Sequence, residues 1–414
     1  MRDKRSYISS KVSSAIFTIA LLATSAWAAP RETILHDFKQ DGRDGVEPRD
    51  SLIFDASGNL YGTTFEGGTH GAGMVFELIP QTGGGWKEKV LHNFNNDGKD
   101  GVGPYASLIF DTAGNLYGTT FGGGAIGYGT VFELTPKAGG TWTQKVLHSF
   151  NAQTEGFYPT AGLVLDSAGN LYGTTSGNDL TTNGMVFELS PRAGRGWKEK
   201  VLYRFKSETV YAGLVLDSAG NLYGTTPKGP GHTGGRVFEL VPQKGGRWKE
   251  KVLHQFTKNG MDGYFPEAAL ILDTTGNLYG TTSFGGAHDA GTVFELTPTA
   301  EGRWTEALLY SFRKNGIDGA FPDGSLIFDA AGNLFGTTGG GGPDNAGAVF
   351  ELTPAAGGGW NEKVLHKFRK DGRDGNFPEA GLVLDAEGNL YGTTFEGGTG
   401  TCGGGCGTAF EVTP

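Results

Sequence analysis

The stretch GNLYGTT at residues 58–64 decides the fold, because the chain repeats it. The same seven letters begin again at Gly114, Gly169, Gly220, Gly276 and Gly388, and GNLFGTT begins at Gly332. The asparagines of successive copies stand 56, 55, 51, 56, 56 and 56 residues apart. One supersecondary unit repeated at such a period is typical of a solenoid or a propeller.

Each repeat contains four segments with the character of β-strands. In the second copy, SLIFD (107–111) and NLYGTT (115–120) flank a tight turn and predict a hairpin. GTVFELTP (129–136) follows, and WTQKVLHSF (142–150) comes after a glycine-rich turn. Four antiparallel strands in every repeat predict the blade of a propeller.

The two ends of the chain indicate a closed ring. The last repeat stops after AFEVTP (409–414) without a fourth strand, whereas ETILHDF (32–38) near the start matches the fourth-strand sequence VLHNF (90–94). An open solenoid needs polar capping repeats at both ends, and none is visible. We therefore predict an all-β, seven-bladed β-propeller that forms a single domain over residues 29–414. Its blades have four antiparallel strands, and pairing of the N-terminal strand with the C-terminal blade closes the ring.

Residues 1–28 have the three parts of a secretory signal peptide. Four basic residues lie within residues 1–12, the apolar run AIFTIALLA (15–23) follows, and Ala26-Trp27-Ala28 provides a cleavage site. The apolar run is shorter than the roughly 20 residues that cross a bilayer. We expect export and cleavage, giving a monomer that is secreted or periplasmic and has no membrane association.

Charge and cysteine content narrow the classes of partner. The formal charge is −10, and removal of residues 1–28 would make it −13. Nucleic acids and anionic lipids require a basic surface, so neither is an expected partner. The two cysteines, Cys402 and Cys406, lie in TCGGGCG. In an oxidising compartment this spacing favours a disulfide over a metal site, which would need further ligands nearby.

The phrases GNLYGTT, GTVFELTP and KVLHxF on an exported chain resemble the GloVer tandem-repeat family, or choice-of-anchor proteins. The resemblance covers Ile34 to Pro414 and implies a repeat fold but no particular activity. Because the chain ends at Pro414 without an anchor segment, we expect free secretion. More distantly, the D-x-x-G-N-L-Y hairpin is similar to that of NHL and streptogramin-lyase propellers, which include both binding proteins and enzymes.

Residues that recur in every blade are interpreted as scaffold. These are the Asp before each hairpin turn, the Glu of each third strand and the Trp that opens most fourth strands. Such carboxylates cap turns or pair with lysine on the next strand. The His of LHxF alternates with Tyr203 and Tyr310. That exchange favours packing and a hydrogen bond over metal ligation.

The loops that join the blades offer one metal hypothesis. Five of them begin with Asp or Asn and read DGRDG, DGKDG, NGMDG, NGIDG and DGRDG, and the second places Asp97 and Asp100 at a spacing similar to calcium loops. Each loop supplies only two side-chain oxygens, whereas calcium takes six or more ligands. Turns are therefore the favoured interpretation. We expect no cofactor, and calcium is the one ion kept as an alternative.

The position after the proline that leads into each blade varies strongly. Around the ring it is Arg49, Tyr105, Thr160, Tyr211, Glu267, Asp323 and Glu379, with Val in place of the proline before Tyr211. Three histidines outside the repeat pattern, His70, His232 and His288, are expected on the same face. Carboxylates, histidines and rings around a channel mouth are what a polysaccharide site uses. The alternative is that these are ordinary solvated loop residues.

Two functions of different class follow. The first is a secreted binding or scaffold module for an extracellular glycan or protein. The alternative is an extracellular carbohydrate-active enzyme, a polysaccharide lyase or hydrolase, that uses a histidine with Glu267, Asp323 or Glu379. The sequence contains no nucleophile elbow, HExxH motif, phosphate-binding loop or dinucleotide fingerprint. Binding is therefore favoured over catalysis, and no catalytic residue is assigned.

Overall fold

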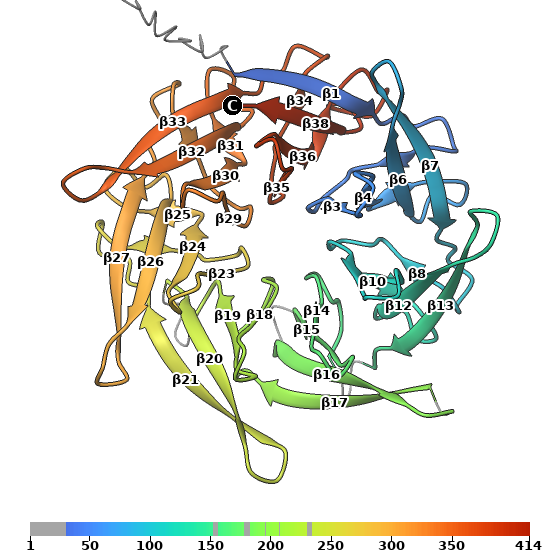
Figure 1. The fold of residues 1–414 in the computed structure, drawn as a ribbon, viewed down its shortest axis with the longest axis horizontal. Helices are drawn as coiled ribbons and strands as arrows, with labels where there is room; N and C mark the ends of the chain where they lie inside the picture. Colours follow the sequence, from blue (N-terminus) through green and yellow to red (C-terminus); the bar gives the residue numbers. More distant parts are fainter. Residues whose placement is uncertain (1–29, 152–155, 178–182, 195, 207, 230–233) are drawn as a thin grey trace, which may run out of the picture.

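The computed structural model describes residues 30–151, 156–177, 183–194, 196–206, 208–229 and 234–414. Within them, seven four-stranded antiparallel sheets form a ring around a central axis (Figure 1). The prediction of an all-β seven-bladed propeller is confirmed. The described part contains no helix long and apolar enough to cross a membrane. The predicted signal peptide, residues 1–28, lies outside the described residues.

The strands of each blade run from the axis outward. The innermost strands are β3 (Ile53–Phe54), β9 (Ile109–Phe110), β14 (Val164–Leu165), β18 (Val215–Leu216), β23 (Ile271–Leu272), β29 (Ile327–Phe328) and β35 (Val383–Leu384). The second strands are β4 (Leu60–Thr64), β10 (Leu116–Thr120), β15 (Leu171–Thr175), β19 (Leu222–Thr226), β24 (Leu278–Thr282), β30 (Leu334–Thr338) and β36 (Leu390–Thr394).

The third and fourth strands are longer and form the outer half of each blade. The third strands are β6 (Met74–Pro80), β12 (Thr130–Pro136), β16 (Met185–Arg192), β20 (Arg236–Gln243), β26 (Thr292–Pro298), β32 (Ala348–Pro354) and β38 (Thr408–Thr413). The fourth strands are β7 (Trp86–Asn93), β13 (Trp142–Ser149), β17 (Gly196–Arg204), β21 (Arg247–Gln255), β27 (Trp304–Ser311), β33 (Trp360–Lys367) and, for the seventh blade, β1 (Arg31–Asp37).

The innermost strands are shorter than the sequence predicts. SLIFD (107–111) was predicted as the first strand of the hairpin, but only Ile109 and Phe110 pair with β10. Leu108 instead packs over Gly118, where an added Cβ would lie 2.9 Å from the Leu108 side chain and 2.6 Å from Phe132. Because the middle of GNLYGTT is glycine, two large side chains can pack against the second strand. This packing takes the place of further backbone hydrogen bonds between the first and second strands.

Five short ladders on one face of the ring were not predicted. Each joins the loop that leads into a blade to the loop between its second and third strands. The pairs are β2 (Gly45–Val46) with β5 (Glu66–Gly67), β8 (Gly101–Val102) with β11 (Gly122–Gly123), β22 (Gly263–Tyr264) with β25 (Phe284–Gly285), β28 (Gly319–Ala320) with β31 (Gly340–Gly341), and β34 (Gly375–Asn376) with β37 (Glu396–Gly397). The ladders hold both sets of loops on the same face, as expected.

The carboxylates that recur in the repeat are part of the scaffold. Asp55 Oδ1 accepts hydrogen bonds from the backbone amides of Ser57 and Asn59, which closes the hairpin turn. The Tyr61 hydroxyl lies 3.1 Å from Asp55 Oδ2 and 2.9 Å from Glu77 Oε1. Glu77 Oε2 in turn accepts a 2.8 Å hydrogen bond from the Lys89 ammonium on the fourth strand. These polar contacts therefore connect the hairpin turn with the second, third and fourth strands of the blade.

The first threonine of each GTT connects its blade to the next one. Thr63 Oγ1 donates to the Ala106 carbonyl across the blade interface. The same bond joins Thr119 to Ala161, Thr174 to Ala212, Thr225 to Ala268, Thr281 to Gly324, Thr337 to Ala380 and Thr393 to Asp50, with lengths from 2.7 to 3.5 Å. Seven bonds make a complete circle. In every case the accepting residue directly follows the variable position behind the lead-in proline.

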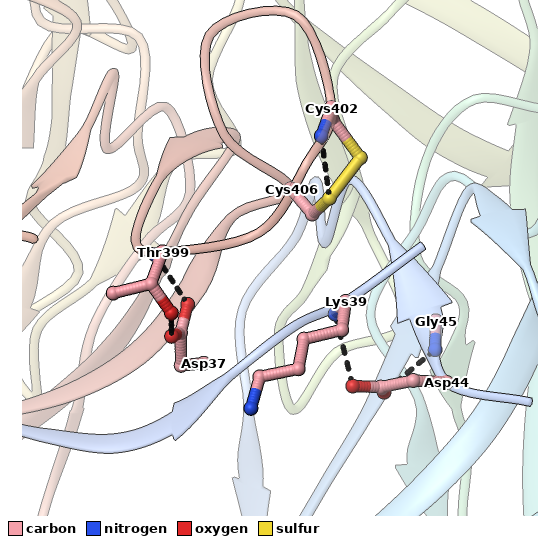
Figure 2. Close-up of a disulfide and its surroundings, with 7 residues drawn as sticks. All are labelled: Asp37, Lys39, Asp44, Gly45, Thr399, Cys402 and Cys406. Atoms are coloured by element: carbon pink, nitrogen blue, oxygen red, sulfur yellow. Dashed lines mark hydrogen bonds between the residues drawn. A yellow bond between two sulfur atoms is a disulfide. The ribbon is translucent and has the colours of Figure 1, made fainter. Parts of the chain in front are cut away.

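The seam that closes the ring lies between the first and last strands. β1 pairs with β38 in an antiparallel register from Arg31↔Thr413 to Asp37↔Thr408, as predicted. Asp37 Oδ1 also accepts a 2.9 Å hydrogen bond from the Thr399 amide (Figure 2). The Phe38 amide donates to the Gly407 carbonyl at 3.1 Å. The C-terminal loop therefore covers the N-terminal strand.

A disulfide shapes this covering loop. Cys402 and Cys406 are bonded, with Cα atoms 5.1 Å apart, which confirms the predicted pair (Figure 2). Cys406 is fully buried and belongs to the apolar cluster that contains Phe38. Its carbonyl accepts a 3.0 Å hydrogen bond from the Glu47 amide. The disulfide therefore lies at the junction between the closing seam and the first blade.

We predict that deletion of residues 29–38 destabilises the whole ring. The deletion removes the outer strand of the seventh blade and the buried Phe38 ring, so the melting temperature should fall by about 10 °C or more. Differential scanning calorimetry of the truncated and full chains measures the difference. Equal melting temperatures would show that the seam contributes nothing to stability.

Candidate functional site

One cavity at the centre of the ring collects the variable position of every blade. Its volume is about 580 Å³, within the range of pockets that bind small molecules. Its wall includes one such residue from each blade, namely Arg49, Tyr105, Thr160, Tyr211, Glu267, Asp323 and Glu379. The structure thus brings together the six residues proposed at this position as ligand contacts.

The backbone that leads into the cavity is strained. In five blades the residue before the lead-in proline has a φ between 56° and 68°, and these residues are Glu47, Tyr158, Phe265, Phe321 and Phe377. This left-handed region favours glycine, which stands at the equivalent position 103 of the second blade with φ 61°. Strained residues concentrate at functional sites. Their presence around one channel mouth supports a site there.

One side of the cavity carries three carboxyl groups on consecutive blades. We call Glu267, Asp323 and Glu379 the acidic arc. Ser283 Oγ donates a 2.6 Å hydrogen bond to Asp323 Oδ1 and lies 3.4 Å from Glu267 Oε2. A single hydroxyl therefore lies between the carboxyls of two neighbouring blades. Glu379 continues the arc at the exposed edge of the channel.

The acidic arc holds protons more tightly than ordinary carboxyl groups do. Burial raises the pKa of Asp323 to about 7, and the charge of Glu267 adds to the shift. Burial likewise raises the pKa of Glu267. Desolvation by the cavity wall and the charge of Asp323 raise the pKa of Glu379. Near neutral pH, the arc therefore shares protons, and a bound cation would stabilise its ionised form.

Beside the acidic arc, on the first blade, the cavity contains a cation surrounded by rings. The Arg49 guanidinium lies 4.1 Å from the ring centre of Phe395, 4.9 Å from that of Phe65 and 5.3 Å from that of Tyr105. Its Nη2 forms a 2.8 Å ion pair with Glu47 Oε2. We call these residues the arginine cage. It combines the ring faces and the carboxylate that stabilise cations in proteins.

A side pocket opens from the acidic arc towards the loop face. Its volume is about 310 Å³, and the three arc carboxyls border both this pocket and the central cavity. Ring side chains from three blades, Phe284, Phe321 and Phe377, form other parts of its wall. Sequence reasoning missed Phe321 and Phe377 as site residues. Their alignment with Phe265 before the lead-in proline was the signal that could have found them.

Two of the three candidate histidines, His70 and His288, are not part of the cavity wall. His70 and His288 lie in exposed turns between the second and third strands of their blades, and neither borders either pocket. His232 lies outside the described residues. The structure does place a further carboxyl, Asp50, in the cavity wall. Asp50 accepts a 2.7 Å hydrogen bond from the Ser107 amide and thereby links two blades.

The two aspartates considered for calcium hold the loop together. Asp97 Oδ1 accepts hydrogen bonds of 2.9 and 3.0 Å from the amides of Lys99 and Asp100. Asp100 accepts a 2.8 Å hydrogen bond from His92 and a 3.1 Å hydrogen bond from Gln144 of the next blade. These oxygens serve the turn and the blade interface. That geometry matches the interpretation of the loops as turns.

Other groups that could hold a metal lie at the blade interfaces. Three clusters place a histidine, an aspartate and a glutamate with ligand atoms within 4.8 Å of one another, and they are Glu32/His366/Asp374, His36/Asp44/Glu88 and His254/Asp262/Glu306. In the second cluster His36 Nε2 lies 3.1 Å from Asp44 and 3.9 Å from Glu88. The LHxF histidine thus forms the expected hydrogen bond, and its ring also packs edge-on against Phe38.

The aspartate and the glutamate of each cluster form a carboxyl pair, and other blade interfaces show how the repeat neutralises such a pair. In the second blade Gln144 replaces the glutamate and donates to Asp100. In the fourth blade the guanidinium of Arg236 lies 3.0 Å from Glu208 and 2.8 Å from Glu250. Where neither substitution occurs, burial and a nearby aspartate raise the pKa of Glu32, Glu88 and Glu362 to about 7. In these described interfaces, an amide, a guanidinium or a proton therefore compensates for the carboxyl pair.

Comparison with known proteins assigns the family. The Gloeobacter/Verrucomicrobia repeat matches residues 6–213 and 207–410. The chain belongs to the Gloeobacter/Verrucomicrobia repeat family. No curated protein matches it. Family membership agrees with the seven repeats and with the resemblance drawn from GNLYGTT.

Several solved structures match this chain at low identity. An oxidoreductase described as a glucose dehydrogenase, from Thermus thermophilus, has a TM-score of 0.44 and 15% identity, and the match covers 93% of this chain and 100% of that chain. A luciferin-regenerating enzyme has a TM-score of 0.46 and 14% identity, over 93% and 96% of the two chains. A protein of unknown function from Dyadobacter fermentans has a TM-score of 0.44 and 13% identity, over 81% and 97%. Similarities at this level carry no argument about function.

We predict that the blade interfaces lose stability as the pH rises through neutrality. The pKa of Glu32, Glu88 and Glu362 lies near 7 in the folded chain and near 4.5 when unfolded. Their contribution is therefore complete below pH 4.5 and is lost as the pH passes 7. The raised pKa of His36 acts in the same direction. Calorimetry should show a lower melting temperature at pH 8 than at pH 5.5.

Replacement of these three glutamates by glutamine supplies the amide that Gln144 already provides. The triple variant should melt about 3 °C or more above the original chain at pH 8 and show a smaller pH dependence. Glu387→Gln in an exposed hairpin turn is the control for loss of charge alone. An unchanged pH dependence in the triple variant would contradict the assignment.

Proposed function

We propose that this protein is a secreted binding module that holds an extracellular glycan in the central cavity. One observation carries the proposal, namely that the variable position of all seven blades faces one cavity of about 580 Å³. The residues that recur in every blade are used for the scaffold, which leaves the variable position available for binding. Rigid frames with varied loops are the usual setting of binding sites.

The wall of the cavity suits a sugar. Tyr105, Phe121 and Tyr211 offer ring surfaces, against which the C–H faces of a saccharide can pack. The acidic arc and the serines Ser51, Ser107 and Ser325 offer hydrogen-bonding groups to hydroxyls from several directions. Apolar rings with a few convergent polar groups are typical of small-ligand pockets. A saccharide chain could enter along the axis of the ring.

Catalysis is the second candidate, and one observation favours it. Asp323 has a pKa near 7 and shares the Ser283 hydroxyl with Glu267, so this pair includes a group able to donate a proton at neutral pH. Paired carboxylates are the machinery of glycoside hydrolysis. His70 and His288, the described histidines considered as partners, do not border the cavity. Binding without turnover therefore remains the main proposal.

The test is a binding screen with soluble cello-, xylo-, manno- and N-acetylated chito-oligosaccharides. We predict that replacement of Tyr105 and Tyr211 together by Ala weakens the best oligosaccharide at least about tenfold, because two ring surfaces are lost. Isothermal titration calorimetry measures the affinity. Reducing-end release on prolonged incubation would establish the enzymatic alternative.

Tyr264→Ala serves as the matched control. This tyrosine lies on the same face in β22, outside the cavity, where its hydroxyl donates to Asp289. Its loss should leave the affinity unchanged. The proposal fails if no oligosaccharide binds, or if the double variant binds as tightly as the original chain.

A further inference from the structure

We propose that the side pocket beside the acidic arc takes the protonated amine of an amino sugar. The inference rests on the proposed function and names the class of glycan that the cavity prefers. The inference follows from a pocket lined by three carboxyl groups and three aromatic rings. Among the described residues, no cation of the chain forms an ion pair with these carboxyls.

The geometry of the pocket matches an ammonium group with a sugar ring attached. Its volume is about 310 Å³, at the lower end of pockets that bind small molecules. Glu267, Asp323 and Glu379 border it on the channel side, so an amine held there would leave the rest of the sugar chain in the central cavity. Carboxylates satisfy ammonium groups through short, charge-assisted hydrogen bonds.

The arginine cage shows the same construction with its cation in place. There, Phe395, Phe65 and Tyr105 surround a guanidinium that is paired with Glu47. In the side pocket, ring side chains again lie beside carboxyls. The pocket therefore has the chemical surroundings that the fold itself uses for a cation, and a ligand can supply the positive charge.

The rings of the pocket already attract ammonium groups. The exposed Lys314 and Lys370 place their Nζ atoms 4.2 and 4.3 Å from the ring centres of Phe321 and Phe377. A ring has two faces, and one lysine covers only one of them. Contacts between a cation and a ring are strongest when water is excluded. Water is excluded more fully in a pocket than on the surface.

A glycine keeps the pocket open. The position after GTT is Phe in the seventh, first and second blades (Phe395, Phe65 and Phe121), and it is Gly339 in the sixth. An added Cβ at Gly339 would lie 3.0 Å from Asp323 Oδ2 and 3.6 Å from Glu379 Cγ. The side chain that fills this site in three other blades is therefore missing at the centre of the acidic arc.

The test compares two tetrasaccharides that differ only at the amine. Isothermal titration calorimetry at pH 7.5 should show that the glucosamine tetramer binds at least tenfold more tightly than the N-acetylglucosamine tetramer. Glu267→Gln, Asp323→Asn and Glu379→Gln together should remove this preference without lowering the melting temperature. The control removes three charges elsewhere with Glu66→Gln, Glu301→Gln and Glu387→Gln, and it should keep the preference.

A steric variant tests the pocket with all three carboxyls retained. Gly339→Phe fills the space beside Asp323 and should also remove the preference for the amine, while binding of neutral oligosaccharides in the central cavity persists. If both tetrasaccharides bind with equal affinity, the inference about the amine is overturned, but the proposed function still holds. Tetralysine bound as tightly as the glucosamine tetramer would also overturn the inference, because the sugar would then be irrelevant. If no saccharide binds at all, the proposed function fails as well.

Discussion

The hydrogen bond from the first threonine of each GTT to the next blade is the interaction on which the site depends. Thr337 Oγ1, for example, lies 2.7 Å from the Ala380 carbonyl, and Ala380 directly follows Glu379 in the chain. The scaffold phrase of one blade thus fixes the backbone beside the variable residue of its neighbour. Because Thr393 bonds to Asp50 across the closing seam, the circle is complete. The repeat therefore positions seven side chains of different type around one cavity.

The sequence predicted the ring and its closure because both follow from repetition. Four strand-like segments per period gave the blade, and the match between residues 32–38 and the fourth strands gave the seam. The lengths of the inner strands could not be predicted, since they depend on how Leu108 and Phe132 pack over Gly118. The short ladders on the loop face also escaped prediction. Their strands are two residues long, each include a glycine and carry no hydrophobic pattern.

The site was predicted in part. Alignment of the repeats found the position that faces the channel, because variation within a rigid repeat indicates a place free of scaffold constraints. It did not find Asp50, Phe321 or Phe377, whose roles follow from the course of the loops. The candidate histidines illustrate the same limit, since loop position alone placed His70 and His288 near a cavity that they do not border. A raised carboxyl pKa is likewise a consequence of burial in the folded chain, as Asp323 and Glu88 show.

The channel combines a cation held in the arginine cage with arc carboxyls that form no ion pair in the described residues. A ligand with one positive group would therefore bind in one orientation, with that group at the acidic arc. The most direct measurement is a crystal structure of the protein soaked with the glucosamine tetramer. The account predicts sugar density in the central cavity, with an amine nitrogen about 3 Å from a carboxylate of Glu267, Asp323 or Glu379. Sugar bound on the outer strands, with the cavity empty, would contradict it.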